Sequence, residues 1–573
     1  MVFPIRRLFF YSVITTTYLL QATTASNCPS SPPNPPLGPW KHDRYAWSDG
    51  KRKQLPHPVT GLPVGTSKSL PRIQHDFVPA SPLSDAESAR KERQAAVKET
   101  FMRAWTSYRN KAWLADELAP ISGKPRNDFG GWSVTLVDSL DTLWVMDLMS
   151  EFEEAVTAAT KIKFLPSTST GGQISMFEIT IRHLGGFLAA YDLTDCNDQR
   201  LLEKAVEVGD MIYASLFAAP NGMPVTWWDP TRRPEHQAFF VTQMLADIAS
   251  SSLELTRLSQ ITGDMRYYGA AARITDLLHD QQNRTKLPGM FPSEVNVRDL
   301  DLTNGTTFSF GAMSDSAYEY FGKTYQLLGG LEPQYARLYQ NAMDTAIEHI
   351  IYRPAIPGQE DILLSGILSA GRALQTDSEQ LACFAGGMFL LGGRLFSNET
   401  HIEVGSKLTR GCIWAYQHSP LKIMPEWFTM NACPSFEPCD LVPPGQSSFN
   451  ETNPECPQKG SMPFACVGLP GFHLRPEAIE SLFYLYRITG IPELQDIAWE
   501  MFMSINDATK TEFGNAAITN VMSSTVVEKE DSMESFWMAE TLKYFYLMFS
   551  DPNHISLDDF VFNTEAHPFR IPR

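Results

Sequence analysis

The sequence predicts an all-α protein built from repeated helical hairpins. From about residue 84 to the C-terminus, apolar residues recur with helical spacing and strand-like alternation is rare. Helix ends closed by Gly, Thr-Gly or Asp also recur, and the marker residues Phe187, Glu254, Phe321 and Phe389 follow one another at nearly equal intervals. Each interval is long enough for two helices and their loops. Such hairpins stack into an open solenoid or a closed ring, and periodicity does not choose between them.

The composition is compatible with one large folded unit. The 573 residues are 43% hydrophobic and 11% aromatic, which is ample for a sizeable core. A chain of this length could form several domains, but a single architecture repeated around a closed core can also use it all. The formal net charge of -18 argues against binding to nucleic acid or to an anionic membrane surface, because both require a basic patch. A cation or a neutral polar ligand fits better.

Three regions are expected along the chain. Residues 1–26 carry Arg6 and Arg7, then an apolar run and small residues, which predicts a cleaved signal peptide or a signal anchor. Residues 27–83 are rich in proline and are expected to form a stem or linker. Residues 84–573 contain the helical pattern and form the main domain. The bulk of the protein is therefore expected in the lumen of the secretory pathway, either anchored to the membrane or secreted.

Two further features suit an oxidising lumenal compartment. Sequons for N-glycosylation occur at Asn283, Asn304, Asn398 and Asn450. The chain has eight cysteines, and four of them crowd into an insert rich in Pro, Gly, Ser and Asn: Cys433, Cys439, Cys456 and Cys466. This insert is expected to be a disulfide-stapled loop. A zinc site is the alternative, but the spacings lack the C-x₂-C pairs that structural zinc prefers.

Several acidic residues lie inside apolar helical patterns instead of on polar faces. They are Glu178, Glu254, Asp315, Glu477, Glu480 and Glu540. Any one of them alone is most simply an exposed residue or a paired core charge. If the hairpins close into a ring, however, all six converge on one end or on the axis. Buried acids of this kind must hold a cation, share protons or hydrogen-bond a polyol.

The start of one helix makes this point most directly. Pro476 suits the first helical position, and an acid beside it complements the helix dipole. Glu477 and Glu480 nevertheless share a face, so two like charges there require water or a cation. Nearby aromatic residues such as Phe536 and Phe483 favour a sugar site, and glycoside hydrolysis also needs two carboxyl groups. Phosphate-binding, dinucleotide-binding, zinc-protease and serine-hydrolase motifs are absent from the sequence.

Several sequence blocks carry a resemblance to a known family. They are LVDSLDTLWVM (136–146), FEITIRHLGGFLAAY (177–191), DSAYEYFGK (315–323), LACFAGG (381–387), LRPEAIESLFYLYRITG (474–490), MESFWMAETLKYFYLMFSD (533–551) and VFNTEAHP (561–568). In these blocks the chain resembles the class I α-1,2-mannosidases, glycoside hydrolase family 47, from about residue 85 to the C-terminus. The resemblance implies a single (α/α)₇ barrel, dependence on Ca²⁺, and inverting removal of terminal α-1,2-linked mannose from high-mannose N-glycans on glycoproteins, in the endoplasmic reticulum or Golgi.

The resemblance also implies roles for individual residues. Glu178 matches the general acid, which acts through a water, Glu477 matches the general base, and Asp315 is the third acid. Thr564 matches the direct calcium ligand, through its hydroxyl and its carbonyl oxygen. Positions that contact sugar or calcium-bound water are matched by Arg182, Glu254, Gln380, Arg475, Glu480, Phe536, Glu540 and Glu565. Cys383 and Cys412 match a disulfide pair of the family.

Two departures and two alternatives accompany this resemblance. Gln380 stands where the family commonly has His, so it can hydrogen-bond a sugar but cannot titrate near neutrality. Met313 stands where members that stop after one mannose tend to carry Arg, which favours broader trimming. The main alternative is a lectin-like relative that steers misfolded glycoproteins to degradation with weak or no catalysis. The other is a different inverting α/α-barrel glycosidase. A monomer is expected.

Overall fold

The computed structural model describes residues 27–38, 59–78 and 84–572, with gaps at 218, 220, 233–235, 357, 359, 440–457, 460–463 and 524. The predicted signal segment 1–26, the sequon at Asn450 and Cys456 lie outside the described residues. Within the described part of the chain, no helix is both long enough and apolar enough to cross a membrane.

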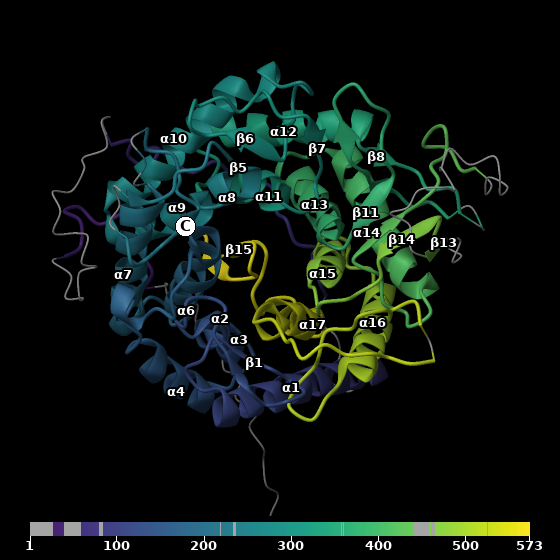
Figure 1. The fold of residues 1–573 in the computed structure, drawn as a ribbon, viewed down its shortest axis with the longest axis horizontal. Coiled ribbons are helices and arrows are strands. Elements are labelled where there is room, and N and C mark those ends of the chain that lie inside the picture. Colours follow the sequence, from purple (N-terminus) through teal and green to yellow (C-terminus); the bar gives the residue numbers. More distant parts are fainter. Residues whose placement is uncertain are drawn as a thin grey trace, which may run out of the picture.

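Helices form two concentric rings (Figure 1). The outer ring consists of α1 (Asp85–Lys111), α4 (Met149–Ala159), α7 (Gln199–Leu216), α10 (Met265–Gln281), α12 (Pro333–His349), α14 (Glu399–His418) and α16 (Glu493–Thr509). The inner ring consists of α2 (Val134–Asp138) with α3 (Leu140–Val145), α5 (Met176–Glu178) with η2 (Ile179–Leu184) and α6 (Gly185–Leu193), α8 (Leu245–Ala249) with α9 (Ser252–Thr262), α11 (Asp315–Leu327), α13 (Ala385–Leu395), α15 (Glu477–Thr489), and η7 (Trp537–Thr541) with α17 (Leu542–Met548). The first helix, α1, contacts the last, α17, so the hairpins close into a ring and do not form an open solenoid.

The two rings differ in how their side chains are buried. In outer helix α12 the buried residues recur at helical spacing, from Tyr335 through Leu338, Tyr339 and Ala342 to Ala346, which leaves a polar outer face. In inner helix α15 every residue from Ala478 to Ile488 is buried. A helix that is buried all round has neighbours on every side, as the inner ring of a double-walled barrel requires. The predicted all-α (α/α)₇ barrel is therefore confirmed.

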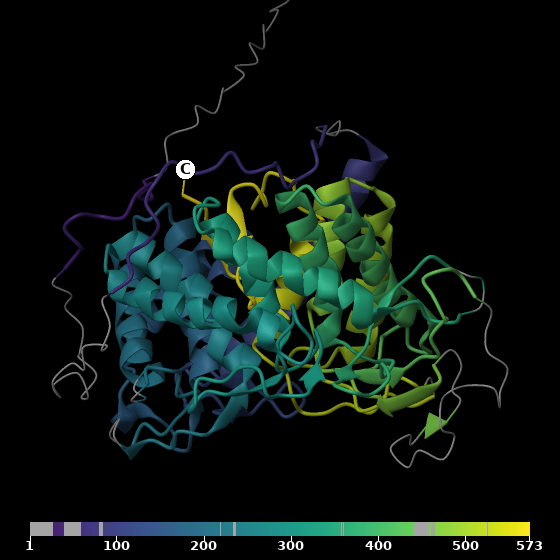
Figure 2. The same ribbon diagram turned by 90° about the horizontal axis from the view of Figure 1, so that it is seen from above.

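Short antiparallel strand pairs join the helices. They are β1 (Glu117–Leu118) with β2 (Pro125–Arg126), β3 (Ile174–Ser175) with β4 (Trp227–Trp228), β5 (Thr242–Met244) with β6 (Glu294–Asn296), β7 (Thr307–Phe308) with β10 (Leu368–Ser369), and β8 (Ile351–Tyr352) with β9 (Leu364–Ser365). A four-stranded sheet has the order β11 (Asp377–Glu379), β12 (Trp427–Thr429), β14 (Cys466–Leu469), β13 (Gln458–Lys459). Figure 2 shows loops and strands gathered at one end of the barrel, with the C-terminus at the other.

A C-terminal hairpin lies inside the barrel. Strand β15 (Phe560–Phe562) contacts inner helix α11, and β16 (Pro568–Arg570) contacts inner helix α6. Phe562 and Phe569 are fully buried, so the hairpin is held by apolar packing against the inner ring. Its turn contains Thr564 and Glu565, and it therefore delivers these two residues to the interior of the ring.

The proline-rich segment differs from the expected stem or linker, because its described parts are bound to the barrel. The backbone N–H of Leu37 donates to Thr262 O (2.8 Å), and that of His75 donates to Arg487 O (2.7 Å). Ile73 and Gln74 are buried. This part of the chain runs along the end of the barrel that also holds the C-terminus (Figure 2).

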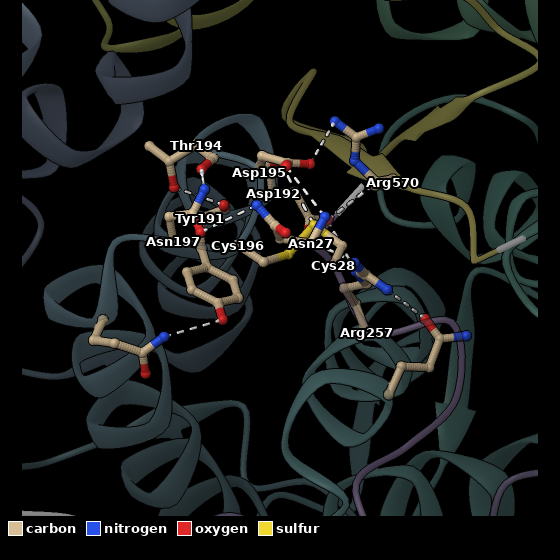
Figure 3. The surroundings of a disulfide bond; sticks show 12 residues. Asn27, Cys28, Tyr191, Asp192, Thr194, Asp195, Cys196, Asn197, Arg257 and Arg570 are labelled. Atoms are coloured by element: carbon tan, nitrogen blue, oxygen red, sulfur yellow. Dashed lines mark hydrogen bonds and ion pairs between the residues drawn. A yellow bond between two sulfur atoms is a disulfide. The ribbon is translucent and has the colours of Figure 1, made fainter. Parts of the chain in front are cut away.

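A disulfide bond between Cys28 and Cys196 ties the N-terminal segment to the end of α6 (Figure 3). Beside it, Asp192 accepts hydrogen bonds from Arg257 Nε (2.9 Å) and from the backbone N–H of Arg570 (2.8 Å). Asp192 and the two cysteines lie close enough together to resemble a metal site, but the two sulfur atoms are bonded to each other and are not thiolate ligands. The group is a junction between the N-terminal segment, the inner ring and the C-terminal hairpin.

Other disulfides agree with the sequence analysis. Cys383 and Cys412 are bonded, as the resemblance implied. Cys433 and Cys439 are bonded to each other, and Cys466 is also in a disulfide, which supports a stapled loop in place of a zinc site.

Candidate active site

A cavity of about 430 Å³ lies where several inner helices begin. Glu178, Asp315 and Glu477 all line it, and they come from α5, α11 and α15 respectively. All three side chains are half-buried, whereas the helix residues that follow them are mostly buried. The volume is within the range of small-ligand sites. Acids separated by hundreds of residues in the sequence are thus brought to one cavity by the closure of the ring.

Two π-helical segments lie beside this cavity. Segment η2 follows Glu178 directly and carries Arg182, and η7 carries Glu540. Both Arg182 and Glu540 line the cavity. Extra residues inserted into a helical turn are frequent at functional sites, because they re-aim side chains that a regular helix would direct elsewhere.

Strained backbone also clusters next to the site residues. Three non-glycine residues have positive φ here: Met313 (77°), Leu474 (67°) and Ala566 (57°). Met313 closely precedes Asp315, and Leu474 closely precedes Glu477. Ala566 directly follows Glu565. Such conformations cost free energy and persist where the surrounding structure imposes them, commonly at functional sites.

Arg182 connects several parts of the site. Its Nε donates to Glu178 Oε2 (2.7 Å), and its Nη1 donates to Ser535 Oγ (3.0 Å) and to Glu565. The rings of Phe129 and Phe536 lie 5.3 Å and 5.7 Å from the guanidinium carbon. Despite burial, the neighbouring carboxylates raise the pKa of Arg182, so the side chain stays a cation. Arg182 therefore orients both Glu178 and Glu565.

A second cation stands beside Glu477. Arg475 Nε donates to Glu426 Oε2 (2.5 Å), whose other oxygen accepts from the backbone N–H of His473 (2.8 Å). Burial raises the pKa of Glu477 to about 7, while the positive charge of Arg475 acts in the opposite direction. Burial also raises the pKa of Asp315 to about 8, with smaller contributions from neighbouring acids that include Glu477. The two acids thus titrate near neutrality.

Further carboxyl groups line the cavity around the hairpin turn. They are Glu319, Glu480, Glu540 and Glu565, and all are buried. Burial, followed by the charges of Glu565 and Glu480, raises the pKa of Glu540 well above its ordinary range. Lys323 contacts Glu319 and lies 3.9 Å from Glu480, so it balances only part of this charge.

A divalent cation fits these residues. Thr564 lines the same cavity and offers a hydroxyl and a carbonyl oxygen, and its backbone N–H donates to Tyr320 Oη (3.3 Å). Oxygen atoms from carboxylates, hydroxyls and carbonyls are the ligands that calcium prefers. Burial, followed by the charges of neighbouring acids, raises the pKa values of Glu480 and Glu540, and a cation would favour their ionised forms.

Two residues expected to contact sugar do not line the cavity. Gln380 is fully buried, its Nε2 donates to Met424 O (2.7 Å), and its Oε1 accepts from Tyr416 Oη (3.2 Å). Glu254 is fully buried as well, and its Oε1 accepts from Tyr320 Oη (2.7 Å) and from Asn563 Nδ2 (2.8 Å). The amide of Gln380 is thus hydrogen-bonded within the protein, and its contact with sugar stays a prediction. Glu254 supports the turn that carries Thr564.

Two residues of the site, Asp247 and Glu319, were not predicted from the sequence. Asp247 lines the cavity from the first turn of inner helix α8, and burial together with the charge of Glu178 raises its pKa to about 6. Its place at the start of an inner helix repeats that of Asp315 and Glu477, so alignment of the hairpins could have found it. Glu319 lies one helical turn after Asp315 on the same face.

The fold and the site define an α/α-barrel protein with the paired carboxyl groups that glycoside hydrolysis requires. The model of glycosyl hydrolase family 47 matches residues 100–571. The chain belongs to this family.

Individual relatives cover most of the chain. It is 33% identical over 522 residues to a mannosyl-oligosaccharide alpha-1,2-mannosidase from Coccidioides posadasii, with 88% of this chain and 95% of that protein covered. It is 33% identical to the human endoplasmic reticulum mannosyl-oligosaccharide 1,2-alpha-mannosidase, with 84% of this chain and 64% of that protein covered. Among solved structures, an alpha-1,2-mannosidase from Trichoderma reesei matches with a TM-score of 0.75 at 30% identity, over 84% of this chain and 99% of the other.

Proposed function

We propose that the protein is a calcium-dependent, inverting α-1,2-mannosidase that trims terminal mannose from high-mannose N-glycans of glycoproteins in the secretory pathway. The observation that carries this proposal is the convergence of Glu178, Asp315 and Glu477 on one cavity in a member of glycosyl hydrolase family 47. Relatives that align over most of this chain carry names of mannosyl-oligosaccharide 1,2-α-mannosidases.

In this mechanism Glu477 is the general base. Its ionised carboxylate takes a proton from a water as the water oxygen bonds to C1 of the terminal mannose. The bond between C1 and the linking oxygen breaks, and that oxygen receives a proton that originates from Glu178 and passes through a second water. Attack on the face opposite the leaving oxygen inverts the configuration at C1. Arg475, held by Glu426, favours the ionised form of Glu477.

Asp315 and Arg182 act on position and protonation. With a pKa near 8, Asp315 is largely protonated at neutral pH, so it donates a hydrogen bond to a sugar hydroxyl. Arg182 fixes the direction of Glu178 through its 2.7 Å hydrogen bond. The ring of Phe536 lines the cavity and packs against the apolar face of the sugar.

The calcium ion would be held, directly or through water, by Thr564 and by four carboxyl groups, those of Glu319, Glu480, Glu540 and Glu565. When bound, the ion supplies positive charge and a template for the sugar hydroxyls.

The test is release of free mannose from a high-mannose oligosaccharide by the purified full chain, with calcium and with a chelator. Proton NMR of the first product reports the anomeric configuration. We expect β-mannose to form first, and only with calcium. Tight sugar binding without mannose release would indicate a lectin-like protein, and release of glucose would indicate a different glycosidase.

A further inference from the structure

The hairpin β15–β16, whose turn carries Thr564, is a small element. Its ladder has three residue pairs, from Phe560 with Arg570 to Phe562 with Pro568 next to the turn. A two-stranded hairpin is at best marginally stable on its own, so the place of the turn depends on what holds the two strands. We call the first pair of the ladder, together with the two residues before it, the open end of the hairpin.

The N-terminal segment holds the open end where β15 begins. Asp558, two residues before the strand, accepts hydrogen bonds at Oδ1 from the backbone N–H groups of Ile73 (2.7 Å) and Gln74 (3.3 Å). Both donors are buried, and Gln74 Nε2 also donates to Pro552 O (2.9 Å). This contact is therefore a packed part of the fold, although its two sides lie near opposite ends of the chain.

The N-terminal segment also holds the open end where β16 finishes (Figure 3). The disulfide between Cys28 and Cys196 fastens the segment to the end of α6. Next to the disulfide, Asp195 Oδ2 accepts a hydrogen bond from the backbone N–H of Asn27 (3.1 Å), and Asp195 Oδ1 lies 3.9 Å from Arg570 Nη2. One carboxylate thus joins the N-terminal segment to the last residue of the hairpin.

The loop that makes these contacts has an unusual backbone. Asp195 and Cys196 both have positive φ, 54° and 57°. Such a conformation costs free energy for a residue with a side chain, and it persists where the surroundings impose it. The disulfide can impose it here. Four residues before Cys196, Asp192 accepts a hydrogen bond from the backbone N–H of Arg570 (2.8 Å), so a change in this loop reaches β16 directly.

The turn needs a fixed position more than most turns do. Calcium affinity depends on the number of charged ligands and on the rigidity of the site. The ladder between the open end and the turn is short and hydrogen-bonded, so a shift at the open end moves Thr564 with it. Both anchors of the open end come from the N-terminal segment, at the end of the barrel that holds the C-terminus (Figure 2).

We propose that the N-terminal segment clamps the open end of the hairpin and thereby sets the affinity of the turn for its cation, with the Cys28–Cys196 disulfide keeping the clamp closed. The proposal rests on the proposed function, because it takes Thr564 as a calcium ligand. Coupling of this kind is reciprocal. Bound calcium must make the disulfide harder to reduce by the same factor by which the disulfide tightens calcium binding.

The first test compares calcium affinity in two double variants with that of the unmodified full chain. Titration calorimetry should show a dissociation constant about five-fold higher or more in Cys28→Ala/Cys196→Ala, as for typical coupling between separate sites. Cys433→Ala/Cys439→Ala is the matched control, because it removes a disulfide from the loop after β12. Hydrogen exchange of residues 560–570 should become faster in the first variant only. Melting temperatures in chelator show whether each variant is folded.

The second test uses the unmodified protein and so does not depend on the folding of a variant. Dithiothreitol, a dithiol, passes two electrons and two protons to the two sulfur atoms, which become thiols, and is itself oxidised to a cyclic disulfide. Cys28 is half-buried and thus partly open to the reagent. Alkylation and mass spectrometry give the reduced fraction at equilibrium. Saturating calcium should raise the ratio of disulfide to dithiol at Cys28 by the factor found in calorimetry, and leave that at Cys433 unchanged.

The outcomes separate the clamp from the proposed function. An unchanged dissociation constant in Cys28→Ala/Cys196→Ala, or a reduction equilibrium that does not respond to calcium, would overturn the proposal. A lower melting temperature in chelator with unchanged calcium affinity would mean that the disulfide only stabilises the fold. Calcium-dependent release of mannose together with either result rejects the clamp alone. If calcium neither binds the unmodified protein nor changes its melting temperature, the calcium part of the proposed function fails and the clamp fails with it.

Discussion

Arg182 Nε donates a 2.7 Å hydrogen bond to Glu178 Oε2, and the guanidinium also contacts Glu565 in the hairpin turn. One side chain therefore links the proposed acid to the proposed calcium site. Because its donors lie in one plane on separate nitrogens, Arg182 can hold both carboxylates in fixed directions, whereas a lysine presents all its donors from one nitrogen on a flexible stem.

Arg182→Lys should keep the positive charge but lose this geometry. We expect kcat to fall by about ten- to a hundred-fold, because a small misplacement of a catalytic group is costly. Steady-state kinetics on the oligosaccharide would measure the loss. Arg200→Lys, an exposed residue paired with Glu153, is the matched control and should leave kcat unchanged. A kcat within two-fold of the unmodified enzyme would remove Arg182 from the positioning role.

Glu477→Gln tests the general base. The amide keeps the shape of the carboxyl group but cannot accept a proton, so turnover should fall by about a hundred- to ten-thousand-fold. Sugar binding should remain, because the cavity is otherwise unchanged. Mannose release gives the first quantity and titration calorimetry gives the second. Near-normal turnover in this variant would assign the base to another group.

The acid limb of the pH profile should report Glu477. A base must be ionised, so activity is lost as the pH falls below the pKa of Glu477, which burial places at about 7. Arg475 opposes that rise, so Arg475→Met should raise the pKa of Glu477 and move the acid limb of kcat/KM to higher pH. Arg475→Lys should leave the limb near its original position. A limb that stays in place in the methionine variant would contradict the assignment.

Thr564→Ala should weaken calcium binding. A ligand that binds only the folded state raises the melting temperature, and the increase shrinks as affinity falls. We expect the stabilisation by calcium to be smaller in Thr564→Ala than in the unmodified protein, as measured by melting with calcium and with chelator. Thr157→Ala, on the exposed face of α4, serves as the control. An equal chelator response in Thr564→Ala and the control would argue against this ion site.

The N-terminal segment should contribute to stability through Gln74. Arg487 is fully buried, and Gln74 Oε1 accepts a 3.0 Å hydrogen bond from its Nη1. Gln74→Ala removes this acceptor from a buried cation and should lower the free energy of unfolding by about 1 to 3 kcal/mol in urea titrations. Asp76→Ala, which alters only an exposed pair with Arg72, should change it by less than about 1 kcal/mol. Equal stability of the two variants would mean that the segment is only loosely attached.

The sequence by itself determined the elements and much of the chemistry. Helical spacing defined the hairpins, and acids inside apolar patterns identified Glu178, Asp315 and Glu477 as unusual before their neighbours were known. These features are local, because they depend only on residue type and on spacing within one or two helical turns.

The tertiary structure decided how these elements meet. Contact between α1 and α17 closes the ring, and the hairpin inside it carries Thr564 to the acids. Closure also determines which face of each inner helix points to the axis. For this reason Asp247 lines the cavity, whereas the side-chain amide of Gln380 forms hydrogen bonds with Met424 and Tyr416. An inner helix is buried on every side, polar residues included, so burial does not mark one face, and only packing against its neighbours selects the face that meets the substrate.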